Sequence, residues 1–385
     1  MTLTRTRKWR ASPAFSVMVK LPAGLWKHFS ANRSISGIEK RGLLVNLVQK
    51  KKVCILPQRL GLGGPAAFQG GLISVLQRRG IDISSDPLEA GNAAILVFGA
   101  ARNTGEIVLA QRAGVRVVQR LNGMNWVHRR RFTGIKHFLK AEYGNLKLRR
   151  LRKSADGIIY QSAFARSWWE REDGRLEKPQ FVIHNGVDLE FFSPDPVTLP
   201  PDRYRVLMVE GHHGGGYDQG LVTAARLLQQ LRNLADRACE LAVVGDVPAA
   251  LKQEIDNFGV TVKWLGVVQR TEIPAIDRSA HLLFSGDVNA SCPNSVIEAM
   301  ACGLPVVAYD TGALPELVST DAGRIAPYGA DVWKLEPPDI ASLANAAWQV
   351  LQNRQALSRG ARVRAGSNFD IERVADRYLT VLLGE

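Results

Sequence analysis

The stretch Ser291-Cys-Pro-Asn-Ser-Val-Ile-Glu-Ala-Met-Ala-Cys-Gly-Leu-Pro305 decides the fold of this chain. It predicts a loop that turns into a short helix, with Ser291 as its cap, Pro293 in its first turn and Gly303 at its end. The residues between are apolar around almost the whole helix, so we expect this helix to be buried. Glu298 lies inside the apolar run, and a buried carboxylate needs a partner because its unpaired desolvation costs several kcal/mol.

Two interpretations of Glu298 are open. In the first, Ser295 and Glu298 form a capping box that satisfies the start of the helix. In the second, the N–H groups of the helix start face a cleft and bind the phosphates of a nucleotide, while Glu298 binds sugar hydroxyls. Asn294 lies one turn before Glu298 on the same face and would share the site.

The wider pattern favours the second interpretation. Asn294-Ser-Val-Ile-Glu-Ala-Met-Ala-Cys-Gly-Leu-Pro-Val-Val-Ala308, followed by Thr311-Gly-Ala-Leu-Pro-Glu-Leu-Val318, resembles the donor-sugar region of family-4 retaining glycosyltransferases of the GT-B fold. The resemblance runs from about Val53 to the end and is closest at 181–192 and 291–318. It implies an α/β protein with two Rossmann-like domains that face a central cleft. It also implies transfer of a sugar from a nucleotide-sugar with retention at the anomeric carbon.

Composition and charge narrow the class of protein. The chain has 385 residues, enough for two or three domains, with 46% hydrophobic and 22% charged residues, as in soluble globular proteins. Its four scattered cysteines form no CxxC pair and no zinc-type spacing with histidine, which indicates a reducing, cytoplasmic compartment and no metal site. The net charge of +14 is concentrated in residues 1–52 and 129–153, which indicates an anionic partner for part of the molecule.

Residues 1–52 are predicted to be a basic N-terminal extension. They resemble a signal peptide only weakly, because Lys20 and Pro22 interrupt the apolar part and no clear cleavage site follows. A loose tail, a membrane-surface segment and a start codon assigned too early are all open interpretations. No apolar run in the chain reaches the ~18–20 residues that span a bilayer.

From Val53 onward, short apolar strands alternate with helical segments, which predicts parallel sheets covered by helices. We expect an N-terminal acceptor domain over 53–197 and a C-terminal donor domain over 198–367, joined by the proline-rich segment 194–201. A terminal helix over 368–385 would return to the N-terminal domain, as in the family that the chain resembles. Ligands would bind at the carboxyl ends of the strands.

Two glycine-rich loops follow predicted strands. Gly61-Leu-Gly-Gly-Pro-Ala66, with Asp82 beyond it, fits a dinucleotide-binding fingerprint poorly, because Pro57–Leu60 separate the strand from the glycines. A tight turn is the other local interpretation, and in the resembling family a similar loop covers the donor. Glu210-Gly-His-His-Gly-Gly-Gly-Tyr217 can expose backbone N–H groups to phosphate, or it is a flexible loop with two solvated imidazoles. Asn185-Gly186 predicts a turn at the hinge between the domains, with an active-site role as the other interpretation.

The chain departs from the family at three places. The glutamate that the family places eight positions before Glu298 is Ala290 here. The Arg and Lys that neutralise the diphosphate are missing from 210–216, so His212, His213, Arg120 or the glycine N–H groups would replace them. A first-domain histidine near the reacting sugar is replaced by Asn122. Each missing donor typically costs ~3 kcal/mol of transition-state stabilisation.

The predicted site residues form two groups, and Val267 joins the second because the resembling family uses its position to contact the base. The catalytic candidates are Asn122, Arg120 and His212, and the donor-binding candidates are Glu298, Asn294, Ser295, Val296, Gly63, Gly64, Gly214, Gly215 and Val267. The resemblance implies no cofactor beyond the nucleotide-sugar co-substrate, and no metal. A metal-independent, hexosyltransferase-like retaining enzyme of polysaccharide biosynthesis is the leading prediction. A catalytically silent protein that binds a nucleotide-sugar, or acts as a partner subunit, is the alternative.

The segment 128–153 predicts a basic helix or helical pair with interleaved aromatic residues. It is either a solvated face over an ordinary apolar stripe or a surface that contacts anionic membrane lipids. The acceptor would be a glycan, a lipid-linked sugar or a small molecule. No recognised nucleic-acid module is present, so nucleic acid is not an expected partner. The predicted location is the cytoplasm, with contact to the inner face of the membrane.

Overall fold

The structure is a computed structural model that describes residues 51–58, 64–102, 104–214 and 218–384. The predicted extension 1–52 lies outside these residues except for its last two positions. Gly63 and Gly215 also lie outside them. None of the helices in the described ranges is long and apolar enough to cross a membrane.

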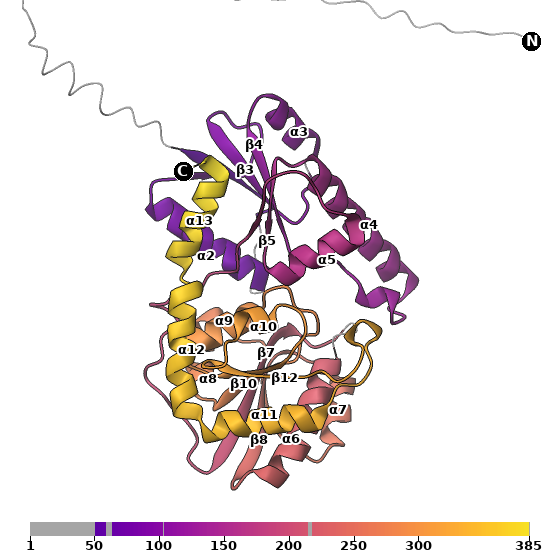
Figure 1. The fold of residues 1–385 in the computed structure, drawn as a ribbon, viewed down its shortest axis with the longest axis vertical. Coiled ribbons are helices and arrows are strands. Elements are labelled where there is room, and N and C mark those ends of the chain that lie inside the picture. Colours follow the sequence, from indigo (N-terminus) through magenta and orange to yellow (C-terminus); the bar gives the residue numbers. More distant parts are fainter. Residues whose placement is uncertain (1–50, 59–63, 103, 215–217, 385) are drawn as a thin grey trace, which may run out of the picture. The chain divides into compact units, whose positions relative to one another are not determined.

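The first domain is a parallel six-stranded sheet with the strand order β2-β1-β3-β4-β5-β6 (Figure 1). Its strands are β1 (Lys52–Leu56), β2 (Asp82–Ser84), β3 (Asn92–Phe98), β4 (Arg116–Leu121), β5 (Gly157–Tyr160) and β6 (Gln180–Val182). Its helices are α2 (Gly64–Arg78), α3 (Thr104–Arg112), the short η1 (Val127–Arg129), α4 (Ile135–Ser154) and α5 (Ala163–Asp173). The strands read as nearly continuous apolar runs because helices cover both faces of a parallel sheet.

The second domain repeats this plan with the strand order β12-β11-β10-β7-β8-β9. Its strands are β7 (Arg203–His212), β8 (Ala238–Asp246), β9 (Thr261–Gly266), β10 (Leu282–Ser285), β11 (Val306–Tyr309) and β12 (Gly323–Ala326). Its helices are α6 (Gln219–Leu234), α7 (Ala249–Asp256), η2 (Arg270–Glu272), α8 (Ile273–Arg278), α9 (Asn294–Ala301), α10 (Leu314–Leu317), η3 (Val332–Lys334), α11 (Ile340–Gln352) and α12 (Arg354–Asn368). The prediction of two Rossmann-like α/β domains is confirmed.

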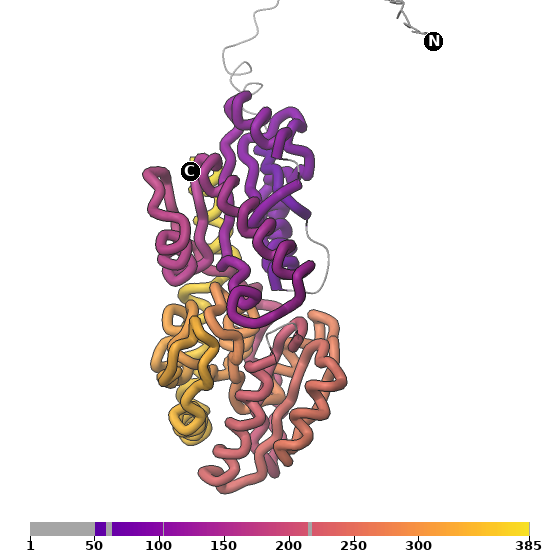
Figure 2. The backbone as a smooth tube through the Cα atoms, turned by 90° about the vertical axis from the view of Figure 1, so that its right-hand side faces the viewer, coloured from indigo at the N-terminus to yellow at the C-terminus, as the bar shows by residue number. Residues whose placement is uncertain are grey.

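The last helix, α13 (Ile371–Leu383), packs against α2 and the first sheet. Its buried face, which includes Val374 and Tyr378, belongs to the same apolar cluster as Phe68 and Leu72 of α2. Before it, α12 packs against α9 of the second domain. Figures 1 and 2 both show the yellow end of the chain lying along the second domain and then against the indigo helix α2.

Each sheet reverses its strand order beside its first strand. In the first sheet β2 lies on one side of β1 and β3 on the other, and in the second sheet β8 lies on one side of β7 and β10 on the other. The reversal points are therefore between β1 and β3 and between β7 and β10. In open α/β sheets such reversal points leave a crevice at the carboxyl ends of the strands, because the flanking connections run to opposite sides. The fold therefore has two such crevices, one in each domain.

The helix α9 is buried as predicted and ends as predicted. Val296, Ile297 and Met300 are at most 1% exposed. The N–H of Leu304 donates to the carbonyl of Ala299, and Gly303 has a φ of 72°, a left-handed value that favours glycine at a helix end.

The predicted caps of α9 are wrong. Pro293 is the N-cap residue, and no side chain caps the helix start. The Ser291 hydroxyl instead accepts a hydrogen bond of 2.6 Å from the backbone N–H of Gly123 in the first domain. Glu298 pairs with Arg270 rather than closing a capping box with Ser295. In both cases the side chain binds a partner that is distant in the sequence, which local spacing cannot predict.

Candidate functional site

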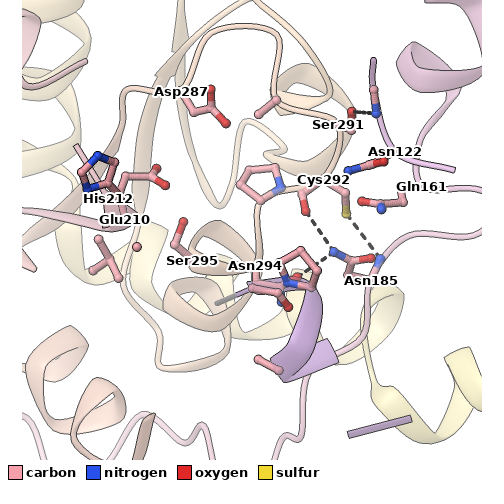
Figure 3. A pocket seen from close by; sticks show the side chains of 18 of the residues that line it. Asn122, Gln161, Asn185, Glu210, His212, Asp287, Ser291, Cys292, Asn294 and Ser295 are labelled. Atoms are coloured by element: carbon pink, nitrogen blue, oxygen red, sulfur yellow. Dashed lines mark hydrogen bonds between the residues drawn. The ribbon is translucent and has the colours of Figure 1, made fainter. Parts of the chain in front are cut away.

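A cleft of about 720 Å³ is lined by segments from both domains. The first domain contributes the start of α2, the segment after β4 and residues near β5 and β6. The second contributes the ends of β7, β8 and β9 and the loop from Asp287 into α9. Figure 3 shows Glu210, His212 and Asp287 on one side of this pocket and the amides Asn122, Gln161 and Asn185 on the other. The carboxyl edges of both sheets thus meet at one cavity.

The N-terminal turn of α9 opens onto the cleft. Pro293, Asn294 and Ser295 line the cavity, and no side chain caps the helix start. Asn294 is fixed by its own amide, which donates to the carbonyl of Gly64 at 2.7 Å and accepts from Asn185 at 2.6 Å. Uncapped N–H groups at a helix start carry partial positive charge and favour an anionic ligand such as phosphate.

Glu298 lines the cleft one turn into α9 and is paired with Arg270. Arg270 donates from Nη1 to Oε1 at 2.6 Å, and its guanidinium lies 5.0 Å from the centre of the Phe192 ring. Burial raises the pKa of Glu298, and Arg270 offsets this only in part. Oε2 of Glu298 has no hydrogen-bond partner in the described part of the chain, so it is available to a hydroxyl of a ligand.

Arg120 is a buried guanidinium at the first-domain wall of the cleft, 3% exposed. It donates from Nε to the Tyr378 hydroxyl at 2.9 Å and from Nη2 to Oδ1 of Asn185. With the Gln161 amide turned so that its oxygen faces Arg120, that oxygen accepts from Nη1 at 2.8 Å. Within the described ranges no carboxylate pairs with Arg120. All the partners are neutral, so its positive charge is available to an anion in the cleft.

Asn122 lines the cavity, and its backbone carbonyl accepts a hydrogen bond of 2.6 Å from the Trp169 indole. The next residue, Gly123, sits where a side chain would not fit: an added Cβ would lie 2.3 Å from Trp168 and 2.8 Å from the Ser291 hydroxyl. The bare backbone at Gly123 therefore permits the hydrogen bond to Ser291 that joins the two domains across the cleft.

The two histidines of the second glycine-rich loop differ in exposure and in their contacts. His212 is exposed, lines the cleft and contacts Asp246 through Nδ1 at 2.9 Å. His213 is 1% exposed, lies away from the cleft and contacts the Val244 carbonyl through Nε2 at 3.0 Å. Burial lowers the pKa of His213, so it is poorly suited to supply a positive charge at neutral pH.

Eight of the twelve predicted site residues line one cavity. These are Arg120, Asn122, His212, Glu298, Asn294, Ser295, Gly64 and Val267. Val296 is fully buried in the core beneath α9 and does not line the cleft. Gly214 is not a lining residue either: it packs beside the His212 ring and Pro248. Gly63 and Gly215 lie outside the described residues.

Three charged lining residues were missed from the sequence: Arg270, Glu210 and Asp287. Arg270 lies 28 positions before Glu298, and no motif links them. Glu210 lies in the last part of β7 and Asp287 follows the neighbouring strand β10, so strand order was the signal that could have paired them. Burial raises the pKa of both carboxyls, and for Glu210 the nearby Asp287 raises it further. In the described residues no group of three or more His, Cys, Asp or Glu could hold a metal ion.

Part of the chain is similar in sequence to known glycosyltransferases. Residues 214–353 match the family described as Glycosyl transferases group 1. The chain is 31% identical over 212 residues to D-inositol 3-phosphate glycosyltransferase from Geodermatophilus obscurus, covering 51% of this chain and 45% of that protein. It is 30% identical over 148 residues to 2-deoxystreptamine glucosyltransferase from Streptomyces kanamyceticus, covering 37% of this chain and 36% of that protein. The matches span less than half the length of these relatives.

Solved structures resemble more of the chain. Sucrose-phosphate synthase from Thermosynechococcus elongatus superimposes with a TM-score of 0.67 at 15% identity, covering 86% of this chain and 98% of that chain. Anabaena HepE in complex with UDP-glucose gives a TM-score of 0.61 at 18% identity, covering 87% of this chain and all of the other. At this identity the likeness shows the fold alone. The fold is GT-B, and residues 214–353 match the glycosyl transferase group 1 family.

Proposed function

We propose that this chain is a glycosyltransferase that moves a sugar from a nucleotide-sugar donor to an acceptor. The observation that carries the proposal is the uncapped start of α9, with Glu298 behind it. This helix lies within the matched residues 214–353 and faces the cleft between the two domains. A helix start suits the diphosphate, and a carboxylate oxygen suits ribose hydroxyls. HepE was solved with UDP-glucose, and a 24% identical relative from Mycobacterium tuberculosis is named a GDP-mannose-dependent mannosyltransferase; both support a nucleotide-sugar donor.

The proposed reaction retains the configuration of the anomeric carbon. The acceptor hydroxyl attacks from the face that the diphosphate leaves: its oxygen bonds to the anomeric carbon as the bond to the phosphate oxygen breaks. The departing phosphate oxygen takes the proton of the hydroxyl, so no protein nucleophile and no metal ion is required. Arg120 and His212 are the candidates that stabilise the charge on the diphosphate, and Asn122 faces the sugar from the first domain.

The reaction is tested by incubating the full chain with UDP-, GDP- and ADP-sugars and measuring nucleotide release with and without acceptors. We expect one donor to react, a product with the donor's anomeric configuration in the NMR spectrum, and the same rate with EDTA present. Release should fall in Glu298→Ala. An inverted product would contradict the proposed stereochemistry, and loss of activity in EDTA would contradict metal independence.

A catalytically silent GT-B protein is the second candidate. Ala290 replaces a family carboxylate, the described residues 210–214 contain neither Arg nor Lys, and Glu210 adds negative charge near the expected diphosphate. Such a protein would bind a nucleotide-sugar, or act as a partner subunit, without turnover. Nucleotide-sugar binding without any hydrolysis or transfer would favour this candidate over the enzyme.

An exposed apolar face on α4 and the turn before it supports a lipid-linked acceptor over a glycan or small molecule. Phe132 is 89% exposed, Ile135 72% and Leu139 63%, and the neighbouring Lys136 and Lys140 are exposed as well. Apolar side chains that can enter the headgroup region, flanked by cations, suit an anionic lipid surface better than nucleic acid. Four unpaired cysteines agree with the cytoplasmic side of such a membrane.

Sedimentation with vesicles tests this face directly. We expect the chain to bind vesicles containing phosphatidylglycerol and not vesicles of phosphatidylcholine alone. The double variant Phe132→Ser with Leu139→Ser should weaken vesicle binding by ~10-fold or more, since each CH₂ buried in the membrane contributes ~0.8 kcal/mol to the binding free energy. A matched control is Val363→Ser, an exposed apolar residue on α12. Equal binding by all variants would leave this helix as an ordinary solvated face.

A further inference from the structure

Glu210 and Asp287 lie where the second sheet reverses its strand order. The strands β7 and β10 pair in parallel, with Leu283 opposite Leu207. Glu210 lies three residues after Leu207 in the last part of β7, and Asp287 follows β10 by two residues. Their side chains therefore flank the crevice between β7 and β10, which is the position where open α/β sheets bind ligands.

Both carboxylates face the cleft without a protein partner. They line the cavity of about 720 Å³, and neither has a hydrogen-bond or ion-pair partner among the described residues. Figure 3 shows them on the side of the pocket opposite the amides Asn122 and Gln161. Both carboxylates are therefore free to bind a ligand at the position where such sheets bind one.

Asn289, in the same loop, is an independent sign of a polar ligand. It lines the cleft, is 5% exposed, and its Nδ2 is buried without a hydrogen-bond partner. Its φ of 57° is a left-handed value, uncommon for a residue other than glycine. Such backbone conformations are found more often near functional sites, although asparagine adopts them more readily than other side chains. The neighbouring Ala290 also lines the cavity and offers no polar group.

The chemistry of the pair favours hydroxyl groups over a phosphate or a metal ion. Carboxylates repel a diphosphate, for which the start of α9 and Arg120 already provide positive charge. Burial raises the pKa of Glu210 to about 8 and that of Asp287 to about 6, and the charge of Asp287 adds to the shift of Glu210, which favours a protonated Glu210 beside an ionised Asp287. Such a pair offers both acceptors and a donor, as sugar hydroxyls require. The described residues add no further His, Cys, Asp or Glu to complete a metal site there.

We propose that Glu210 and Asp287 bind the hydroxyl groups of the donor's sugar, in place of a carboxylate at position 290. The inference rests on the proposed function, because it assumes that the cleft takes a nucleotide-sugar. It assigns the two ends of the donor to different groups: the helix start and Glu298 hold the nucleotide, and the carboxylates of Glu210 and Asp287 select the sugar.

The experiment compares the dissociation constants of a nucleotide-sugar and of its free nucleoside diphosphate by calorimetry. The variants are Glu210→Gln, Asp287→Asn and their combination. We expect the nucleotide-sugar to bind about 10- to 100-fold more weakly, the loss for hydrogen bonds to a charged group. The free diphosphate should bind equally well or more tightly, because a nearby negative charge is gone. Glu254→Gln and Asp256→Asn, both exposed on α7, are the matched controls.

The outcomes separate the inference from the proposed function. A wild-type chain that binds neither ligand overturns the proposed function itself. A wild-type chain that binds both, with variants that still prefer the nucleotide-sugar, overturns only the role of Glu210 and Asp287. Equal weakening of both ligands also overturns it, since the carboxylates would then act on the nucleotide. If EDTA lowers the wild-type affinity to that of the double variant, the pair holds a cation instead.

Discussion

Arg270 supplies the partner that a carboxylate inside a buried helix requires. Glu298 lies within an apolar face of α9, where an unpaired charge would cost several kcal/mol. Arg270, itself partly exposed, reaches Oε1 of Glu298 from η2, and Oε2 has no hydrogen-bond partner among the described residues. The pair therefore orients Glu298 and offsets part of the cost of burying its charge, without using both of its oxygens.

Replacing Glu298 by Gln should weaken donor binding by about 1.5–3 kcal/mol, the usual contribution of a hydrogen bond to a charged group. Gln keeps the size of the side chain, so the core under α9 should remain packed. Calorimetric titration of the responding nucleotide-sugar measures the change, with Glu254→Gln as the control. An unchanged affinity in a folded variant would restrict Glu298 to its ion pair with Arg270.

At the scale of elements, the sequence pattern predicted α9 well and its surroundings poorly. Apolar residues on all sides and Gly303 at the end made the helix recognisable. The partners of Ser291 and Glu298 could not be predicted, because they come from Gly123 and Arg270, which local spacing does not reach. Helix existence follows from periodicity, whereas caps and ion pairs depend on tertiary contacts.

The helix α4 is joined to η1 by Glu142, which carries a pH-dependent part of the stability. Arg129 donates to both carboxylate oxygens, at 2.6 and 2.9 Å, and His128 contacts one of them at 2.8 Å. Arg129 first, and His128 after it, lower the pKa of Glu142 from its ordinary 4.5 to about 2. Because the folded pKa is depressed, this stability is present above about pH 4.5 and is lost as pH falls toward 2.

Glu142→Gln should therefore lower the free energy of unfolding by about 1–2 kcal/mol at pH 7, allowing for solvent screening of a partly exposed pair. The difference between variant and wild type should shrink as pH falls from 4.5 toward 2. Urea unfolding at several pH values checks this, and Glu254→Gln should show no such dependence. A difference that stays constant with pH would exclude the ion pair as its source.

At the scale of the whole described chain, side chains from each domain satisfy groups of the other. The Glu316 carboxylate in α10 accepts from the backbone N–H groups of Ala163 and Phe164, at 2.8 and 2.6 Å, where α5 begins. Trp333 of the second domain packs against Phe164 and Trp168, with ring centres 6.1 and 5.0 Å apart. These contacts hold the cleft walls together on the side of α5.

Glu316→Gln should lower the free energy of unfolding by about 1–2 kcal/mol, because the amide accepts through one oxygen and removes a negative charge from a helix start. Donor affinity should change little, since Glu316 does not line the cleft. Urea unfolding and calorimetry on the same samples separate the two quantities. A large loss of donor affinity with unchanged stability would contradict a purely structural role.

The two-domain fold was predictable because strand and helix periods alternate along the chain, and motifs at 291–318 resemble a known family. Most predicted site residues meet at one cleft because they follow strands whose carboxyl ends share an edge. The errors at the site have two causes. Val296 belongs to the core, since alternate positions of a helix start face opposite sides. Glu210 and Asp287 become neighbours only through the pairing of β7 with β10, which sequence order hides.

Thermal unfolding of the full chain in the presence of UDP-, GDP- and ADP-sugars tests the central claim most directly. A ligand at 100 times its dissociation constant stabilises the folded state by ~2.7 kcal/mol, which gives a clear rise in melting temperature. We predict that one nucleotide class raises the melting temperature, that Glu298→Ala reduces this rise, and that Glu254→Gln preserves it. No rise with any nucleotide-sugar would contradict the assignment of the cleft as a donor site.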